Sequence, residues 1–560
     1  MKYPYELKPF GPVPSERQLA HLRAGKKAFF HFGVNTFTDK EWGEGTERES
    51  CFQPTQTDCR QWIRTVKAAG FQIAILTAKH HDGFCLWPSA YTEHSVKNSP
   101  YKNGQGDVVR EFIDACREYG VKPGLYLSPW DRNAPGWGKS EYNDFYVNQL
   151  TELLTNYGPL YEIWWDGAGS KDTPYDWGRW AYTVRNYQPQ AGIFGSMGAT
   201  PYVEFRWIGN ESGYAGDPCY ETIDPQALEI ETTAVLNSGT LGGARFIPAE
   251  VDVSIRPGWF YHPEQDDEVK TVEQLVRLWY QSIGRGSMML LNFPPDRSGL
   301  IHEKDAAHAL RAHQLVARML SVNLAADGAA TSAQQRCEKC EAQNMLVDSD
   351  DVFFAAADGA GQVVITVSLP EKRTFNTFLI GEYIPLGVRV CGYRVFAKVD
   401  GTWLLLKDKK SIGYLWAEYF DQVCSDEIKI ELYEFLAPPV LRCFGLYYME
   451  IDPFAEKKVG AEAKDLAKGK SARVIYKDNG AVVEFGGVYP FNTVMFNGKG
   501  IWRYRLEAFD GSNYYEVFRG VRPDERQVIR LQDRIEGSYQ IRLVTEVVGD
   551  ESLEIAVFDL

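Results

Sequence analysis

The sequence predicts an α/β protein: an irregular (β/α)₈ barrel of the TIM type followed by two all-β sandwich domains. Eight apolar, β-branched and aromatic runs recur in the first part of the chain, with helical patterns between most of them. Eight such strands over about 300 residues is the expected size of this barrel. After Leu324 the pattern changes to short alternating runs between Gly and Asp turns, which is typical of sandwiches. We therefore expect a barrel over 1–324 and sandwiches over 325–455 and 470–560.

The eight strand-like runs of the predicted barrel are Ala28–Phe32, Gln72–Thr77, Lys122–Leu127, Tyr161–Trp165, Gly192–Gly195, Val203–Ile208, Arg245–Val251 and Ser287–Asn292. Apolar residues at helical spacing predict helices over Thr57–Ala69, Val108–Tyr119, Asn143–Asn156 and Val272–Ile283. The gap between the fifth and sixth runs is too short for a full helix. We therefore expect the barrel to be irregular at that point.

The C-terminal part of the chain is organised by two polar stretches. Ala325–Ala333 is small and polar and predicts a linker, and Glu456–Lys470 predicts a second linker or a short surface helix. The strands expected in the first sandwich are Gln362–Val367, Thr377–Ile380, Arg389–Lys398, Glu427–Tyr433 and Cys443–Ile451. Those expected in the second are Val482–Phe485, Trp502–Glu507, Tyr514–Phe518, Gln527–Leu531, Tyr539–Thr545 and Leu553–Phe558.

The composition is that of a globular protein with an acidic balance. Sixty Lys and Arg residues against 75 Asp and Glu residues leave a net charge of −15, which disfavours nucleic acid and anionic membranes as partners. No apolar run approaches the roughly 20 residues of a membrane span. Aromatic residues make up 14 % of the chain. Large cores and β-rich domains account for such a content more readily than sugar binding does, although aromatic faces also cover sugar rings.

The ten cysteines are too few for a disulfide scaffold. Cys337 and Cys340 form a lone CxxC motif without a second pair at zinc-ribbon spacing, so a metal or redox role is disfavoured. The N-terminus lacks the apolar segment of a signal peptide. We expect a periplasmic or secreted protein whose signal peptide is missing from this sequence, and a cytoplasmic location stays open.

Polar, ionisable and Trp residues cluster at the C-terminal ends of the predicted barrel strands. In this fold the C-terminal rim carries the active site. Structural need alone does not place acids and histidines at one end of so many strands, so the pattern indicates an active site. In chain order the cluster comprises His31, His80, His81, Asp82, Ser128, Trp130, Asp131, Asp166, Asn210, Glu211, Glu250, Asp252 and Asn292.

Two carboxylates stand out among the rim residues. Asp166 follows two indoles in the string Trp164–Gly167, and Glu211 lies two strands further round. Paired carboxylates in a pocket perform general acid, base or nucleophile work when their environments separate their pKa values, and glycoside hydrolysis needs such a pair. The alternative is that one of them is a structural acid paired with a neighbour such as Arg206.

The string His80-His81-Asp82 allows two interpretations. Together with His31 and Asp166 it could form a metal site, which needs three or four converging ligands. Neutral imidazoles beside aromatic rings also suit the recognition of sugar hydroxyl groups. One of the two histidines could instead pack inward against a backbone carbonyl. The aromatic neighbours on the same rim are Trp42, Trp130, Trp164 and Trp165.

The segment from Glu250 to Trp259 is dense in polar and aromatic groups. Arg256 could hold a catalytic carboxylate or a substrate hydroxyl group. It could equally form a structural ion pair with Glu250 or Asp252. The residues alone do not separate these two roles.

Six strings, in this order, resemble the α-L-fucosidases of glycoside hydrolase family 29 and span the predicted barrel. The third, Lys-His-His-Asp-Gly-Phe, is highly specific, and the others are strong as an ordered set. The strings are Phe30-His31-Phe32-Gly33, Glu41-Trp42, Lys79-His80-His81-Asp82-Gly83-Phe84, Tyr126-Leu127-Ser128-Pro129-Trp130-Asp131 and Trp164-Trp165-Asp166-Gly167, followed by Leu290-Leu291-Asn292-Phe293-Pro294-Pro295.

The resemblance implies a retaining double displacement without a cofactor or metal, acting on a fucosylated oligosaccharide or glycoconjugate. Asp166 matches the family's nucleophile. The residues expected to hold the fucose are His31, Glu41, His80, His81 and Trp164, with Trp42 and Trp130 lining the pocket and Arg256 and Trp259 as further candidates.

The general acid/base is less uniform in this family. In the subgroup that acts on branched α-1,3/1,4-fucosyl chains it is a Glu after the sixth strand, which Asn210-Glu211 matches, and Phe246–Trp259 also resembles that subgroup. The first sandwich resembles a discoidin-type jelly roll. Two other classes stay open: a catalytically silent glycan-binding protein, and a metal-dependent hydrolase built on His80, His81 and Asp82.

Overall fold

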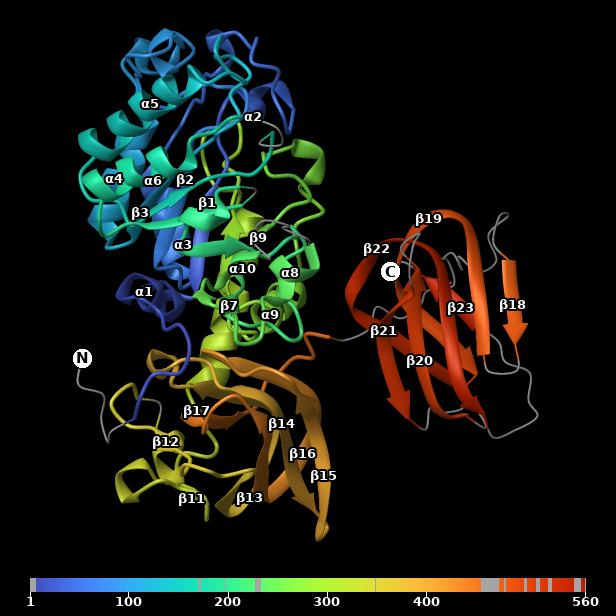
Figure 1. Ribbon diagram of the computed structural model, residues 1–560. Helices are drawn as coiled ribbons and strands as arrows, with labels where there is room; N and C mark the ends of the chain where they lie inside the picture. The colour runs from blue at the N-terminus through green and yellow to red at the C-terminus, as the bar shows by residue number, and fades with distance from the viewer. Residues whose placement is uncertain are drawn as a thin grey trace. The chain divides into compact units, whose positions relative to one another are not determined.

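The computed structural model divides into two compact units, Met1–Pro453 and Phe454–Leu560, which are described separately (Figure 1). The residues described are 7–169, 173–196, 198–226, 233–347, 349–454, 473–477, 480–497, 501–509, 514–521, 526–547 and 555–558. Among them, no helix is long and apolar enough to cross a membrane.

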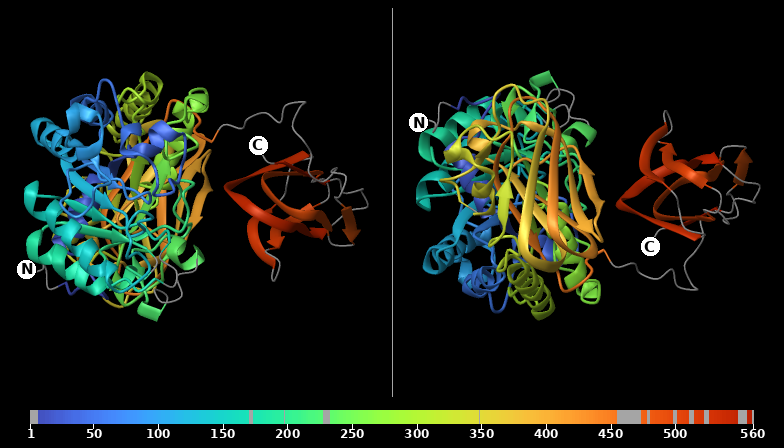
Figure 2. Two further views of the ribbon diagram at one scale, coloured as in Figure 1. Left: turned by 90° about the horizontal axis from the view of Figure 1, so that it is seen from above. Right: turned by 90° about the horizontal axis from the view of Figure 1, so that it is seen from below.

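The first unit contains the predicted eight-stranded closed barrel, in which every strand runs parallel to its neighbours. Helices surround the strands, as the view from above shows (Figure 2). The barrel strands are β1 (Lys26–Phe30), β2 (Ile73–Lys79), β3 (Lys122–Leu127), β4 (Glu162–Trp164), β5 (Gly192–Gly195), β6 (Phe205–Trp207), β9 (Ala249–Ser254) and β10 (Met288–Asn292).

The seventh predicted strand, Arg245–Val251, is wrong in its bounds. Its first residues form β8 (Arg245–Phe246), which pairs with β7 (Thr222–Ile223) in a separate antiparallel sheet. Pro248, which has no N–H to donate to a ladder, separates β8 from the barrel strand β9. As a result Glu250 and Asp252 lie within the strand rather than after it.

The helices follow the predicted periodicity. In α3 (Cys59–Ala68), Trp62, Ile63 and Val66 are buried on one face, and Asp58 caps the first turn. Between β5 and β6 the described residues hold one 3₁₀ turn, Thr200–Tyr202, which confirms the expected irregularity. The other helices are α1 (Glu16–Ala24), α2 (Val34–Thr38), α4 (Val108–Tyr119), α5 (Tyr142–Asn156), α6 (Trp177–Tyr187), α8 (Thr233–Ser238), α9 (Val272–Gln281) and α10 (Glu303–Leu320).

The first sandwich is one hydrogen-bonded antiparallel sheet wrapped around an apolar core. The predicted strands 362–367 and 377–380 are parts of a single strand, β13, whose register against β16 shifts between Ser368 and Arg373. The strand β15 was not predicted, because its residues do not alternate in polarity. The strands are β11 (Ala329–Thr331), β12 (Phe354–Ala355), β13 (Val363–Glu382), β14 (Val390–Val399), β15 (Thr402–Lys409), β16 (Trp416–Phe435) and β17 (Val440–Tyr447).

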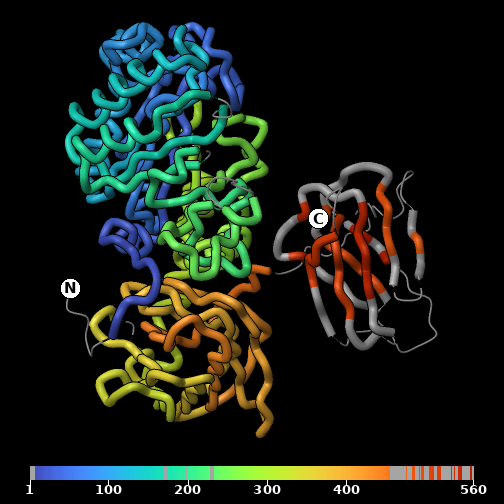
Figure 3. Tube along the Cα trace, viewed as in Figure 1, coloured from blue at the N-terminus to red at the C-terminus, as the bar shows by residue number. Residues whose placement is uncertain are grey.

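The stretch Ala325–Ala333, expected to be a linker, belongs to the sandwich. Ala325 is fully buried in its core, and β11 pairs with β13. Hydrogen bonds join the sandwich to the barrel. Tyr414 N, for example, donates to Glu221 Oε1 over 2.7 Å, and Ala417 N donates to Gly284 O over 2.7 Å. The trace in Figure 3 follows the chain from the barrel into this domain.

The second unit contains another antiparallel sheet, of the order β18-β19-β22-β20-β21 with β23 beside β19. Its apolar core includes Phe491, Leu506 and Ile541. The expected linker Glu456–Lys470 lies outside the described residues. The strands are β18 (Arg473–Lys477), β19 (Gly480–Asn497), β20 (Ile501–Phe509), β21 (Tyr514–Val521), β22 (Arg526–Val547) and β23 (Ile555–Phe558).

Candidate active site

A cavity of about 210 Å³ is lined by residues from the C-terminal ends of the barrel strands. Eight of the eleven predicted site residues line it: His31, Trp42, His80, His81, Trp164, Asp166, Glu211 and Trp259. The other lining residues are Phe29, Tyr126, Gly167, Ala168, Ser196, Trp207 and Asp252. Glu41, Trp130 and Arg256 do not line it.

Asp166 lies two residues after β4 and is held by a hydrogen bond to each carboxylate oxygen. Ala168 N donates to Oδ1 over 2.7 Å, and the Tyr126 hydroxyl donates to Oδ2 over 2.9 Å. His81 Nε2 lies 3.7 Å from Oδ2. The side chain remains 26 % exposed, so the carboxylate is oriented by the protein but open to the cavity.

Glu211 follows β6 at the cavity mouth. Its Oε2 accepts a hydrogen bond of 3.2 Å from Trp259 Nε1. Partial burial of the carboxyl group raises the pKa of Glu211, and the nearby charges of Asp166 and Glu41 raise it further. The two acids therefore stand in different environments, one anchored by donors and the other favoured in its protonated form.

The alternative pairing with Arg206 is not made. Arg206 is fully buried, and its Nε donates to Leu236 O over 2.9 Å while a terminal nitrogen donates to Tyr220 O over 2.9 Å. The guanidinium thus donates to backbone carbonyls and contacts neither Asp166 nor Glu211, which line the cavity.

Two of the three cavity histidines have assignable tautomers. Asn292 Nδ2 donates to Trp259 O, so Asn292 Oδ1 faces His31 Nδ1 at 2.9 Å and accepts its proton. Ser128 Oγ donates to Trp130 O, and therefore accepts the proton of His81 Nδ1 at 2.8 Å. In the neutral imidazoles Nε2 is then an acceptor.

Burial keeps these imidazoles neutral. It lowers the pKa of His31 to about 3 and also lowers the pKa of His80 and of His81. The buried His80 Nδ1 has no hydrogen-bond partner among the described residues. A ligand that brings hydroxyl groups could satisfy these nitrogens.

The imagined metal set of His31, His80, Asp82 and Asp166 does not converge. Asp82 accepts hydrogen bonds from Asn35 Nδ2 and Phe84 N instead of facing the cavity. Among the described residues, the grouping close enough to hold an ion is Asp39, His262 and Glu264, which lies outside the cavity lining.

The aromatic residues form the cavity walls. Trp164 stacks on Phe194 with ring centroids 4.1 Å apart, and its Nε1 donates to Glu250 Oε1 over 3.0 Å. Trp42 is 55 % exposed at the mouth. Trp130 packs behind His81, with ring centroids 4.9 Å apart, and therefore supports the lining without forming it.

Glu41 holds a loop in place. Its Oε2 accepts from Trp259 N over 2.8 Å, and its Oε1 accepts from Phe260 N over 3.1 Å and lies 2.6 Å from His262 Nε2. In the structure Glu41 thus fixes the loop that carries Trp259, instead of lining the cavity itself.

Arg256 is a correction to the sequence analysis. Its Nε donates to Asp305 Oδ2 and a terminal nitrogen donates to Asp266 Oδ1, each over 2.8 Å. The side chain points away from the cavity toward α10, and it pairs with neither Glu250 nor Asp252. Its role is structural, because it links the segment after β9 to α10 through Asp305.

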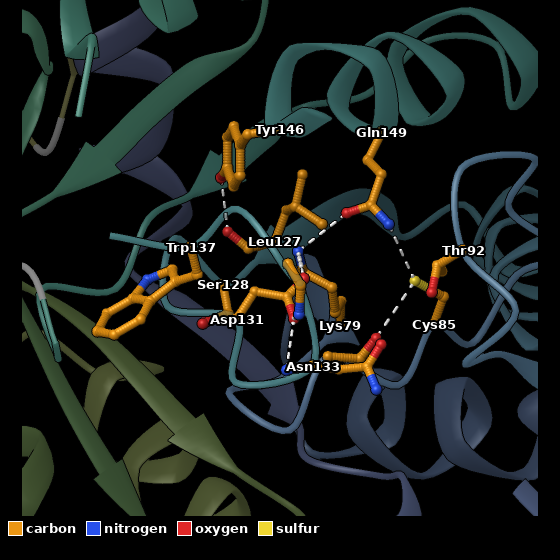
Figure 4. A network of polar contacts seen from close by, with 12 residues as sticks. Lys79, Cys85, Thr92, Leu127, Ser128, Asp131, Asn133, Trp137, Tyr146 and Gln149 are labelled. Carbon is orange, nitrogen blue, oxygen red and sulfur yellow. Dashed lines mark hydrogen bonds and ion pairs between the residues drawn. The ribbon is translucent and has the colours of Figure 1, made fainter. Parts of the chain in front are cut away.

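A buried polar network joins the loop that carries the lining residues His80 and His81 to the loop after β3 (Figure 4). Lys79 Nζ, at the end of β2, donates to Asp131 Oδ2 over 2.7 Å and to Gln149 Oε1 over 2.9 Å. Asp131 Oδ1 also accepts from Asn133 N and Ala134 N. The ion pair therefore fixes the segment of His80 and His81 against the loop after β3.

Sequence reasoning missed Tyr126, Ser196, Trp207 and Asp252 as lining residues. Tyr126 lies in β3, whose residues are all buried after Lys122, so its hydroxyl gave no separate signal. Asp252 was noticed only as a rim acid, since the bounds of its strand were wrong. An acid within a strand, flanked by apolar residues, was the available signal.

The chain resembles proteins of one family in three comparisons. The family model described as Alpha-L-fucosidase matches residues 18–315. Alpha-L-fucosidase 1 of Arabidopsis thaliana is 38 % identical over 451 residues, which cover 78 % of this chain and 88 % of that protein. A crystal structure of a putative α-L-fucosidase from Bacteroides thetaiotaomicron is 44 % identical with a TM-score of 0.77, covering 79 % of this chain and 99 % of that one. A glycoside hydrolase 29 family member from an unknown rumen bacterium is 30 % identical with a TM-score of 0.71, covering 99 % and 100 %.

Proposed function

The chain belongs to the α-L-fucosidase family of glycoside hydrolases, and we propose that it is a retaining exo-enzyme that releases L-fucose from α-1,3/1,4-fucosylated glycans. The observation that carries the proposal is the presence of Asp166 and Glu211 in one cavity, in unlike environments. Two carboxyl groups with separated roles are what a double displacement requires.

In the first step Asp166 acts as the nucleophile. A carboxylate oxygen attacks the anomeric carbon of the fucosyl group and forms an ester bond as the glycosidic C–O bond breaks. The electron pair of that bond stays on the leaving oxygen, which takes a proton from Glu211. The raised pKa of Glu211 favours the protonated form that this step needs.

In the second step Glu211, now ionised, takes a proton from water. The water oxygen attacks the anomeric carbon from the face that the leaving group vacated and displaces Asp166. Two successive inversions leave fucose with the configuration of the substrate. Glu211 regains its proton and Asp166 its charge.

The cavity supports recognition of a single terminal sugar. Acceptor nitrogens of His31 and His81 can receive hydroxyl protons, and Phe29 and Trp164 supply apolar surface for the C–H face and the methyl group of a deoxy sugar. A volume of about 210 Å³ suits one ring rather than a chain, which supports action at the end of a glycan.

The preference for branched linkages rests on Glu211 following β6 and on the resemblance of Phe246–Trp259. The test is hydrolysis of a Lewis-type trisaccharide beside an α-1,2-fucosyl lactose, with 4-nitrophenyl α-L-fucoside as the common reference. We expect release of fucose from the trisaccharide in large excess over the α-1,2 compound. Equal rates, or a preference for the α-1,2 compound, would contradict the linkage proposal.

Proton NMR of the first-formed product tests the retaining mechanism. We expect α-L-fucose before mutarotation, and initial β-fucose would contradict retention.

A silent glycan-binding protein would bind the trisaccharide without releasing fucose, and loss of turnover in a chelator would favour a metal-dependent hydrolase.

A further inference from the structure

A third carboxyl group stands in the cavity besides Asp166 and Glu211. Asp252 lies on β9, where alternation turns Glu250, Asp252 and Ser254 into the barrel and their neighbours out. Glu250 lies one layer deeper, against Lys27 and Trp164. Asp252 occupies the next layer up and lines the cavity, 3 % exposed.

The charged side chains that face Asp252 among the described lining residues are acidic. From β6, Trp207 Nε1 donates to Asp252 Oδ1 over 2.8 Å, and β10 presents no titratable side chain. Asp166 and Glu211 face it from the ends of β4 and β6. None of the described lining residues is Lys or Arg, and the three lining histidines are neutral.

Three carboxylates in one small cavity cannot all be ionised, because like charges at short range in a poorly solvated site repel strongly. The proton stays on the group that water reaches least. Asp166 is 26 % exposed and Glu211 stands at the mouth, whereas Asp252 is almost fully buried. Burial first, and then the charges of Glu211 and Asp166, raise the pKa of Asp252 well above its ordinary value.

We propose that Asp252 takes part in the reaction as a neutral carboxylic acid whose Oδ2–H donates a hydrogen bond to an oxygen of the bound sugar. The Trp207 indole occupies Oδ1, which leaves Oδ2 to carry the proton. Of the three acids, one then attacks, one exchanges a proton and the third keeps its proton throughout. The inference rests on the proposed roles of Asp166 and Glu211.

The experiment removes Glu211 from the titration so that Asp252 is seen alone. In Glu211→Gln, 4-nitrophenyl α-L-fucoside can still react, because nitrophenolate leaves without a proton donor. We expect kcat/KM of this variant to fall about tenfold per pH unit above the pKa of Asp252, where the donor becomes a charge. In the double variant Glu211→Gln/Asp252→Asn this alkaline fall should be absent, since Asn keeps an N–H donor and cannot ionise.

Two further variants separate donation from a structural role. Asp252→Ala should lower kcat/KM about 3- to 10-fold near neutral pH, the range of one lost hydrogen bond, and Asp252→Asn should restore it. If Asp252 only supported Trp207, Asp252→Asn would also restore kcat/KM. The double variant would then show the same alkaline fall as Glu211→Gln. The pH profile is therefore the deciding measurement.

Infrared difference spectra provide a readout that does not depend on activity. The spectrum of Glu211→Gln minus that of the double variant should contain the C=O stretch of a protonated carboxyl group at neutral pH. Absence of that band, loss of the alkaline fall in Glu211→Gln alone, or its persistence in the double variant would overturn the proposal. Failure of the proposed function has a different sign: Glu211→Gln would then hydrolyse the Lewis-type trisaccharide as fast as the unmodified enzyme.

Discussion

The Tyr126 hydroxyl donates to Asp166 Oδ2 over 2.9 Å, and the Tyr126 ring stacks on Trp164 with centroids 5.4 Å apart. One side chain thus connects the floor of the cavity to the carboxylate at its rim. Because Tyr126 is fully buried, the donor has little freedom to turn away, and Asp166 is oriented before any substrate arrives.

Replacing Tyr126 by Phe should lower kcat/KM by about tenfold or more, because a hydrogen bond to a charged group contributes about 1.5–3 kcal/mol. Without the donor the carboxylate of Asp166 loses the contact that fixes its orientation. Steady-state kinetics with 4-nitrophenyl α-L-fucoside measure the loss.

The matched control is Tyr146→Phe. Its hydroxyl is equally buried but donates to Leu127 O, over 2.7 Å, and not to a carboxylate. Its kcat/KM should change little. An equal loss of kcat/KM in both variants would show that the effect comes from general loosening of the barrel.

Asp166→Ala and Glu211→Ala should differ in their response to azide. The first should abolish turnover of every fucoside, since no nucleophile remains. The second should slow the trisaccharide at least about 10²-fold, the lower contribution of general acid catalysis, and should spare the nitrophenyl fucoside in its first step. Azide should rescue Glu211→Ala and give the α-fucosyl azide after two inversions. A β-azide from that variant, seen by NMR, would mean that the roles are exchanged.

The pH dependence with a natural leaving group follows from the raised pKa of Glu211. The general acid must be protonated in the free enzyme. The kcat/KM for the trisaccharide therefore has its full value below the pKa of Glu211 and falls as the pH rises through that pKa. We expect the alkaline midpoint above pH 4.5, the ordinary value for Glu. A midpoint at or below that pH would contradict the raised pKa of Glu211.

The buried ion pair of Lys79 and Asp131 should matter for stability. Lys79→Met leaves the Asp131 charge buried without its partner, which costs about 3–5 kcal/mol in the free energy of unfolding. Urea denaturation measures the loss. Arg60→Gln is the control, because its pair with Glu118 is exposed and contributes at most about 1 kcal/mol. A loss for Lys79→Met as small as that of the control would contradict the structural role of this pair.

The barrel was predictable because hydrophobic periodicity and the length of the chain both indicate it. The bounds of β9 were not, since the apolar run continues through Pro248 and the break lies in hydrogen bonding rather than in polarity. The positions of Asp166 and Glu211 in the cavity followed from the rule that the ends of parallel strands meet. The partner of Arg256 did not, because Asp305 is 49 residues away on a helix whose packing no local pattern specifies.

The contacts between the barrel and the first sandwich also bear on which segments of such a gene recombination can exchange. Tyr414 N is held by Glu221 of the barrel, and Ala325, just past the last barrel helix, is sealed in the sandwich core. A protein fragment that ended at Leu324 would lack Tyr414, so the buried Glu221 would lose this hydrogen-bond donor, and the base of the barrel would be uncovered. Recombination that preserves these contacts must therefore exchange the region up to Pro453 as a whole.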